Sequence, residues 1–197
     1  MSNPGPTLNP ESFWFLRHGE TDWNTRNLAQ GNVDIPLNAN GLAQAKSAAL
    51  LLRGKTIGAI VASPLGRAKV TAEIAGEAVG LPVAFDPGLR ECAYGVMEGQ
   101  PMTEWFTAWV EGTMTPDGGE SFADLKQRAV DAVNRCLRHP APVLIVAHGA
   151  LFRALRAVMG HEPNVRTRNA VPMWCEPPAT GSGRWGIEYA DMPSAGG

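Results

Sequence analysis

The chain has little charge, few cysteines and no long apolar run. Of its 197 residues 18% are charged, and 17 Lys and Arg against 19 Asp and Glu leave a net charge of -2. This balance gives no general attraction to nucleic acid or to an anionic membrane. No apolar stretch approaches the ~20 residues that a transmembrane helix needs. We therefore expect neither nucleic acid nor a membrane as a partner, and any basic feature must be local.

Cysteine is scarce and lacks the spacing of a metal site. The three cysteines are Cys92, Cys136 and Cys175. An odd number of scattered cysteines is typical of a reducing compartment, so a cytoplasmic location is expected. The start, MSNPGPTLNPES, lacks the basic and apolar blocks of a secretory signal. Residues 1–12 and 191–197 are predicted to be flexible tails around one domain, 13–190.

Short apolar runs alternate with helical patterns, which predicts an α/β fold. The runs expected to form strands are 13–17, 57–62, 82–86, 143–147, 171–176 and 184–190. Helices are expected near 40–53, 65–79, 121–138 and 150–159. The alternation indicates a three-layer α/β/α sandwich with a mostly parallel sheet of about six strands. On the first helix, the predicted buried face comprises Leu42, Ala45, Ala49 and Leu52.

Cations and imidazoles follow three of the predicted strands. FWFLRHG ends in Arg17 and His18, VLIVAHG leads into His148 and Gly149, and ASPLGRA places Arg67 in the first turn of the next helix. In open α/β sheets, ligands bind outside the carboxyl ends of the strands. Arginine binds two oxygens at once, and helix N-termini favour anions. The collection therefore suits a dianionic phosphoryl group.

Each of these residues alone has an ordinary explanation. A histidine at a strand end is more often structural than catalytic, and a single arginine is usually a surface charge. Two histidines could also ligate a metal ion, but no carboxylate pair or cysteine cluster stands beside them. No metal and no cofactor is therefore expected. Their joint occurrence at equivalent strand ends favours catalysis.

The motifs that contain these residues resemble those of the histidine phosphatase superfamily, the phosphoglycerate-mutase-like proteins. They are LRHGET (16–21), WN (23–24), QGNVDIPLNANGLAQA (30–45), ASPLGRAKVTAE (62–73), LRECAYGVMEG (89–99), GGES (118–121) and VAHGALFRAL (146–155). The motifs follow the family's order at comparable spacing over residues 13–170. Each one is weak alone, and together they are highly specific.

The resemblance implies a role for each site residue. His18 would take the phosphoryl group as a phosphohistidine, and its oxygens would be held by Arg17, Arg67 and His148. Glu91 would protonate the leaving oxygen and then activate the attacking water. Further substrate contacts are expected from Trp23, Asn24, Gln30, Trp105 and Gly149.

Like-charge repulsion sets the expected protonation of the two strand-end histidines. Arg17 and Arg67 should keep His18 neutral, which a nucleophile requires, because nearby cations disfavour a second positive charge. A backbone acceptor on one ring nitrogen would fix its tautomer. His148 can remain cationic opposite a phosphate.

The predicted function is hydrolysis of a small phosphorylated metabolite, without a metal. From Glu91 through Leu125 there is no Lys or Arg, so the second anionic group of a mutase substrate is not expected to find cations there. Trp105, Phe106 and Trp109 suggest instead an aromatic wall beside the leaving group. Trp105 and Trp109, spaced by four, equally suit the packing face of a short helix.

Two other functions remain as alternatives. One is a cofactor-dependent phosphoglycerate-type mutase, and the other is a non-catalytic phosphate-binding interaction module. Residues 91–120 are predicted to form a partly helical excursion over the active site. Neither the natural substrate nor the oligomeric state can be read from the sequence, and a homodimer is one option.

Overall fold

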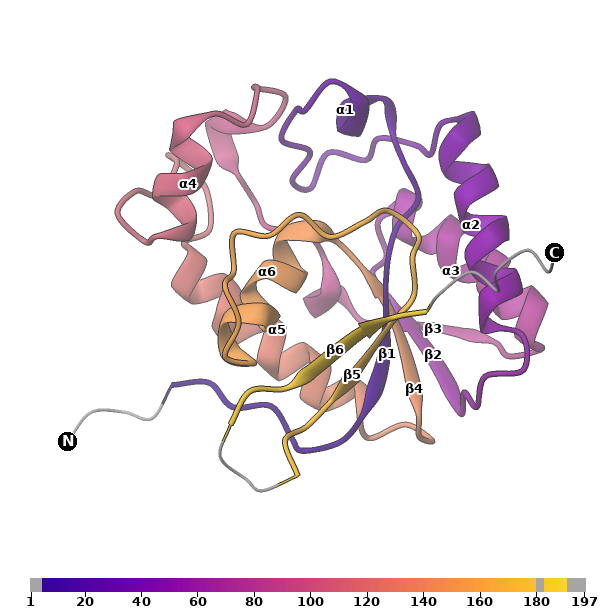
Figure 1. Cartoon of the computed structure of the whole chain (residues 1–197). Coiled ribbons are helices and arrows are strands. Elements are labelled where there is room, and N and C mark those ends of the chain that lie inside the picture. Colours follow the sequence, from indigo (N-terminus) through magenta and orange to yellow (C-terminus); the bar gives the residue numbers. More distant parts are fainter. Residues whose placement is uncertain (1–4, 180–182, 191–197) are drawn as a thin grey trace, which may run out of the picture.

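A six-stranded sheet runs through the middle of the protein (Figure 1). The computed structural model describes residues 5–179 and 183–190. Its strands are β1 (Phe13–Arg17), β2 (Ala59–Ala62), β3 (Val83–Phe85), β4 (Val143–Ala147), β5 (Met173–Glu176) and β6 (Gly186–Tyr189). In the order β3-β2-β4-β1-β5-β6 the first four strands are parallel, and β5 and β6 are antiparallel additions. The predicted mostly parallel sheet of about six strands is confirmed.

Helices cover both faces of this sheet. They are α1 (Asp22–Thr25), α2 (Ala39–Leu52), α3 (Gly66–Val79), α4 (Glu104–Val110), α5 (Phe122–Cys136) and α6 (Gly149–Val158), with 3-10 turns at Pro87–Leu89 and Gly95–Met97. In Figure 1, α2 and α3 lie on one side of the sheet and α5 and α6 on the other. The three-layer α/β/α sandwich is therefore observed.

The strands read as continuous apolar runs because both of their faces are buried. In β1, Phe13 and Phe15 belong to the core shared with α5 and α6. Trp14 and Leu16 point the other way, into the core shared with α2 and α3. Each fully buried large apolar side chain contributes roughly 1.5–3 kcal/mol. β4 shows the same alternation between the two cores, and its parallel pairing with β1 and β2 places the carboxyl ends of all three strands at one edge of the sheet.

The buried face of α2 contains three of its four predicted residues, Ala45, Ala49 and Leu52, and Leu42 is the exception. Leu42 is 39% exposed, and the buried residues of the helix are Gly41, Ala45, Ala48, Ala49 and Leu52. Asn38 caps this helix, because its side-chain oxygen accepts from the Gly41 N–H at 2.8 Å. Small residues on the buried face let α2 approach the sheet and α3 closely, which turns Leu42 outward.

The described part of the predicted N-terminal tail is packed onto the domain. Leu8 is only 5% exposed and belongs to the core beside α5. Asn134 on α5 donates to the Thr7 carbonyl at 3.0 Å and accepts from the Asn9 N–H at 2.8 Å. Residues 1–4 and the predicted tail 191–197 lie outside the described residues.

The 91–120 excursion contains one 3-10 turn and the short helix α4, above α5 and α6 in Figure 1. A helix of this length depends on packing for its stability. Trp109 provides that packing: it is fully buried, with ring centroids 5.2 Å from Tyr94 and 5.1 Å from Phe122. Its Nε1–H donates to the Glu120 carbonyl at 2.9 Å.

Candidate active site

The carboxyl ends of the parallel strands border a cavity of about 210 Å³. The strand-end residues and the excursion both contribute to its wall, as expected for an open α/β sheet. Of the predicted site residues, the structure brings to this wall Arg17, His18, Asn24, Gln30, Arg67, Glu91 and Gly149. Residues far apart in sequence therefore share one small polar space.

The ring of His18 is fixed in one orientation. His18 is 2% exposed, and its Nδ1 lies 2.7 Å from the Gly19 carbonyl oxygen. A carbonyl can only accept, so Nδ1 carries the proton and Nε2 keeps a free lone pair. Burial, and then the charges of Arg67 and Arg17, hold the pKa of His18 well below its usual value. The imidazole is therefore neutral at physiological pH, with Nε2 available as a nucleophile.

Gly19 is required for close packing rather than for an unusual backbone angle. A Cβ atom at this position would lie 2.3 Å from the Gly41 carbonyl oxygen at the start of α2. The Gly19 N–H also donates to Thr71 Oγ1 at 3.1 Å. The loop that carries His18 is thus pressed against α2 and α3, and no side chain fits between them.

Two buried arginines each keep at least one donor free. Arg17 Nη1 donates to the Thr167 carbonyl at 2.7 Å, and Arg67 donates to the carbonyls of Val33 and Gly31 at 2.9 and 2.7 Å. The Nε atoms of both arginines are buried without a partner. Burial lowers the pKa of Arg17 to about 10, so it stays charged at neutral pH. An oxyanion between them would satisfy the free donors.

His148 lies behind His18 rather than on the cavity wall. Its ring centroid is 5.3 Å from that of His18, and its Nε2 is 2.7 Å from Ser63 Oγ. The side chain is fully buried, and its Nδ1 has no partner. Burial and the charge of Arg67 hold the pKa of His148 well below its usual value. The unliganded protein therefore favours a neutral His148, and a cationic His148 opposite a phosphate stays a prediction.

The start of α6 holds the carboxyl group of Glu91. The backbone N–H groups of Ala150 and Leu151 donate to its two oxygens at 3.0 Å, and the N–H of Cys92 donates to Oε1 at the same distance. Three backbone donors fix the position of this side chain on the cavity wall. A carboxyl group so placed can exchange a proton with a ligand in the cavity.

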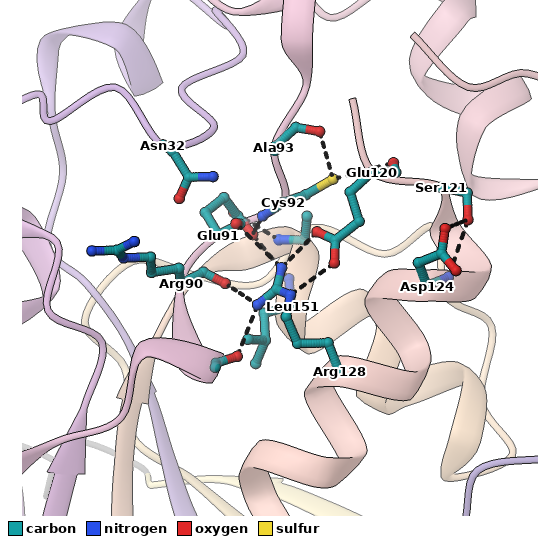
Figure 2. A network of polar contacts seen from close by, with 12 residues as sticks. Asn32, Arg90, Glu91, Cys92, Ala93, Glu120, Ser121, Asp124, Arg128 and Leu151 are labelled. Atoms are coloured by element: carbon teal, nitrogen blue, oxygen red, sulfur yellow. Dashed lines mark hydrogen bonds and ion pairs between the residues drawn. The ribbon is translucent and has the colours of Figure 1, made fainter. Parts of the chain in front are cut away.

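Arg128 on α5 clamps the backbone that carries Glu91 (Figure 2). It donates to the carbonyls of Gly88 and Arg90 at 2.8 Å and to that of Glu91 at 3.3 Å. It also forms a two-point ion pair with Glu120, at 2.7 and 2.6 Å. The position of Glu91 is thus set by Arg128 on α5, through the backbone, and by the N–H groups of α6, through the carboxyl group.

The two tryptophans predicted to contact substrate are not brought to the cavity. Trp23 packs against Gly99, and Trp105 donates from Nε1 to the Pro101 carbonyl at 2.8 Å. The aromatic residues on the cavity wall are Tyr94 and Phe106. The aromatic wall thus exists, but the i, i+4 spacing of the tryptophans reflects packing of α4 on the domain.

The polar residues of the cavity wall that sequence reasoning missed include Arg153, Arg166 and Thr167. Arg153 follows Gly149 by four residues on α6, so the helical period could have placed it on the same face. Arg166 and Thr167 lie in the segment between α6 and β5, where no periodic pattern points to them. Segments outside 91–125 therefore supply the cavity with two further cations, Arg153 and Arg166.

Other features of the described residues bear on the sequence predictions. The three cysteines are buried and unbonded. Across residues 5–179 and 183–190, no three His, Cys, Asp or Glu side chains are grouped to hold a metal ion. Within the same residues, no helix has both the length and the apolar character needed to cross a membrane.

Known proteins share both the sequence and the fold. Residues 13–172 match the family model of the histidine phosphatase superfamily (branch 1). A probable phosphoglycerate mutase GpmB from Yersinia pestis is 36% identical over 207 residues, covering 92% of this chain and 95% of that protein. The solved structure of a mycobacterial glucosyl-3-phosphoglycerate phosphatase is 32% identical, with a TM-score of 0.78 over 90% of this chain and 97% of that one. A protein of Thermus thermophilus, TTHB049, is 28% identical, with a TM-score of 0.74 over 91% and 99%.

Proposed function

The chain belongs to the histidine phosphatase superfamily, and we propose that it hydrolyses phosphomonoesters of small metabolites through a phosphohistidine on His18. The observation that carries this proposal is the setting of His18, whose Nδ1–H is tied to the Gly19 carbonyl. Its Nε2 lone pair is left free in a cavity that also contains Arg17, Arg67 and Glu91. A lone pair, two cations and an acid are the groups that phosphoryl transfer requires.

In the first step His18 Nε2 attacks phosphorus, and the bond between phosphorus and the ester oxygen breaks. The leaving oxygen takes the proton of Glu91, which becomes a carboxylate. The free Nε donors of Arg17 and Arg67 bind the equatorial oxygens and stabilise their charge. In this step the two arginines stabilise the negative charge on the phosphoryl oxygens, so the step needs no metal ion.

In the second step water attacks the phosphohistidine. Glu91 takes a proton from this water, the bond between phosphorus and Nε2 breaks, and inorganic phosphate leaves. His18 returns to its starting tautomer because Gly19 still holds its Nδ1 proton. Covalent catalysis speeds a reaction by dividing one difficult displacement into two easier ones. The polar cavity of about 210 Å³ leaves room for a water beside the phosphoryl group.

A phosphoglycerate-type mutase is the second candidate. Arg153 and Arg166 favour it, because they add cations that a substrate with a second anionic group would use. The relative named as a probable phosphoglycerate mutase supports the same assignment, whereas the structural neighbour is named as a phosphatase. Hydrolysis is the stronger candidate because water can share the cavity with a phosphohistidine. A non-catalytic binding module would have no need of an acid held as firmly as Glu91.

Release of p-nitrophenol from p-nitrophenyl phosphate, with and without EDTA, tests the proposal. We expect turnover that EDTA does not reduce, loss of turnover in His18→Ala, and normal turnover in the matched control His139→Ala, whose side chain is exposed. Interconversion of 2- and 3-phosphoglycerate without phosphate release would show that the protein is a mutase rather than a hydrolase. Absence of turnover on a broad phosphomonoester panel would leave only the binding module.

A further inference from the structure

The segment between α6 and β5 is tied to the strand end that carries His18. Arg17 Nη1 donates to the Thr167 carbonyl at 2.7 Å, and the Ala170 N–H donates to the Arg17 carbonyl at 3.0 Å. Asn169 adds a third tie, because its Nδ2 donates to the His18 carbonyl at 3.0 Å. Ala170 has a φ of 47°, in the left-handed region that alanine rarely adopts. Such backbone strain persists only where surrounding contacts hold it, and it is concentrated at functional sites. The three ties therefore fix where the side chain of Asn169 lies.

The amide of Asn169 bridges the His18 backbone and the side chain of Asn24. Its Nδ2 also donates to Asn24 Oδ1, at 3.2 Å. The carbonyl of His18 can only accept a hydrogen bond, so the end of the Asn169 amide that faces it must be the NH2 group. Likewise, the Thr21 N–H can only donate, and it lies 3.1 Å from Asn24 Oδ1. The orientation of both amides is therefore decided by backbone groups that can play only one role.

Asn24 is left with its NH2 group for the cavity. The residue lines the cavity and is only 6% exposed. Its Oδ1 accepts from Thr21 and Asn169, whereas its Nδ2 has no protein acceptor within residues 5–179 and 183–190. Amide N–H donors stabilise the charge of a phosphoryl oxygen, and an amide oxygen in the same place would repel it. The side chain therefore suits an anionic ligand in only one of its two orientations.

We propose that Asn169 is a positioning residue of the phosphoryl transfer, which holds the Asn24 amide so that its NH2 group rather than its oxygen faces the phosphoryl group. Asn169 itself does not line the cavity, so it acts through Asn24. Without Asn169, the Asn24 oxygen keeps a single donor, the Thr21 N–H, and turning the amide over costs one hydrogen bond instead of two. The contact with the His18 carbonyl also couples the position of Asn24 to that of the nucleophile. This inference rests on the proposed function, because it requires a phosphoryl group in the cavity.

A double-mutant cycle in kcat/KM for p-nitrophenyl phosphate, with Asn24→Ala and Asn169→Ala, tests this role. Asn24→Ala should lose about 10- to 10²-fold, the scale of one hydrogen bond to a charged group, and Asn169→Ala should lose a large part of the same factor. The double variant should lose no more than Asn24→Ala alone, because Asn169 then has no amide to hold. Asn134→Ala is the matched control: this asparagine also makes two hydrogen bonds to a remote segment, at Thr7 and Asn9, but it does not line the cavity. Its kcat/KM should stay at the wild-type value.

Asn169→Asp repeats the test with a side chain of the same shape that cannot donate when it is ionised. In the Asn24→Ala background this variant measures the effect of the added charge alone. The inference would be overturned if either Asn169 variant lowered kcat/KM by the same factor in both backgrounds. A residue that acts only through the His18 backbone would give this result, because its loss matters whether or not Asn24 is present. Wild-type kcat/KM in both Asn169 variants would overturn the inference as well.

Binding of inorganic phosphate separates a failure of this inference from a failure of the proposed function. Dissociation constants are measured by calorimetry on the wild type, the two alanine variants of the cycle and the double variant, and this measurement needs no turnover. If the wild type hydrolyses no ester but phosphate binding shows the same coupling, the hydrolase proposal fails and the role of Asn169 stands. If the wild type hydrolyses esters and the losses multiply in both measurements, the role of Asn169 fails and the hydrolase proposal stands. If the wild type neither hydrolyses esters nor binds phosphate, both fail.

Discussion

Arg128 does not line the cavity, but its replacement by methionine should lower catalytic activity by displacing Glu91. Arg128 donates to three carbonyls around Glu91 and pairs at two points with Glu120 (Figure 2). Its side chain is 27% exposed and that of Glu120 is 16% exposed, so the pair is only partly screened by water. We expect a loss of about 2–3 kcal/mol in the free energy of unfolding, below the 3–5 kcal/mol of a fully buried pair.

The catalytic effect of Arg128→Met should depend on the leaving group. A displacement of Glu91 by about 1 Å is expected to lower turnover by about 10²-fold where protonation of the leaving oxygen limits the rate. An alkyl phosphate needs this acid, whereas p-nitrophenolate leaves well without a proton. The assay is kcat/KM for both esters, with the urea midpoint measured on the same samples. The alkyl ester should lose much more activity than the aryl ester.

Arg135→Met is the control for this prediction. Arg135 lies on α5 as Arg128 does, and its loss removes an ion pair with Asp86 at 2.9 Å. The side chain of Arg135 is 47% exposed, and its hydrogen bonds go to Asp86 rather than to Glu91. Exposed pairs contribute about 0.2–1 kcal/mol, and the ratio between the two esters should stay at its wild-type value. The reasoning would be refuted if Arg128→Met lowered both esters equally, or if Arg135→Met changed the ratio as much.

Three further predictions concern pH, packing and phosphate binding. The pKa values of His18 and His148 are lowered in the folded state, so below about pH 6.5 the unfolded chain binds protons that the folded chain does not. The free energy of unfolding should therefore be at its full value above about pH 6.5 and fall as the pH drops. The expected loss is up to roughly 1.4 kcal/mol per pH unit for each histidine. Urea midpoints at pH 7.5 and 5.5 measure this, and a slope unchanged in His148→Gln would contradict it. Gly19→Ala should lower the free energy of unfolding by about 1–3 kcal/mol, because the added Cβ would clash with the Gly41 carbonyl. An unaltered melting temperature would disprove this close packing. Arg67→Lys removes the unpartnered Nε donor and should lower kcat/KM by about 10²–10³-fold with an unchanged circular dichroism spectrum. Near-normal activity would show that this donor does not stabilise the transition state.

The sequence predicted those parts of the site that rest on the sheet. Strands buried on both faces appear as unbroken apolar runs, and the first polar residues after them, Arg17, His18 and His148, mark the strand ends. Because parallel strands end at the same edge, their convergence followed from topology alone. The structure adds the contact that fixes the His18 tautomer, which comes from the adjacent Gly19 carbonyl.

The outer wall of the cavity could not be predicted in the same way. Arg166 and Thr167 belong to an aperiodic segment whose path depends on tertiary contacts, such as the Arg17 bond to the Thr167 carbonyl. Trp105 and Trp109 showed a helical period, but the period does not tell which face meets the ligand. Likewise, the full burial of His148, which sets its protonation, depends on packing around the ring.

The central claim is that His18 carries the phosphoryl group between the two displacements. Glu91→Gln should trap this state with radiolabelled p-nitrophenyl phosphate, because its good leaving group needs no acid in the first step while water activation is lost in the second. After rapid quenching at high pH and trypsin digestion, acid-labile label is predicted on peptide 18–26, in which His18 is the only histidine. Label on peptide 139–153 instead, or continued turnover in the wild type with no phosphoprotein in the trap, would contradict the account.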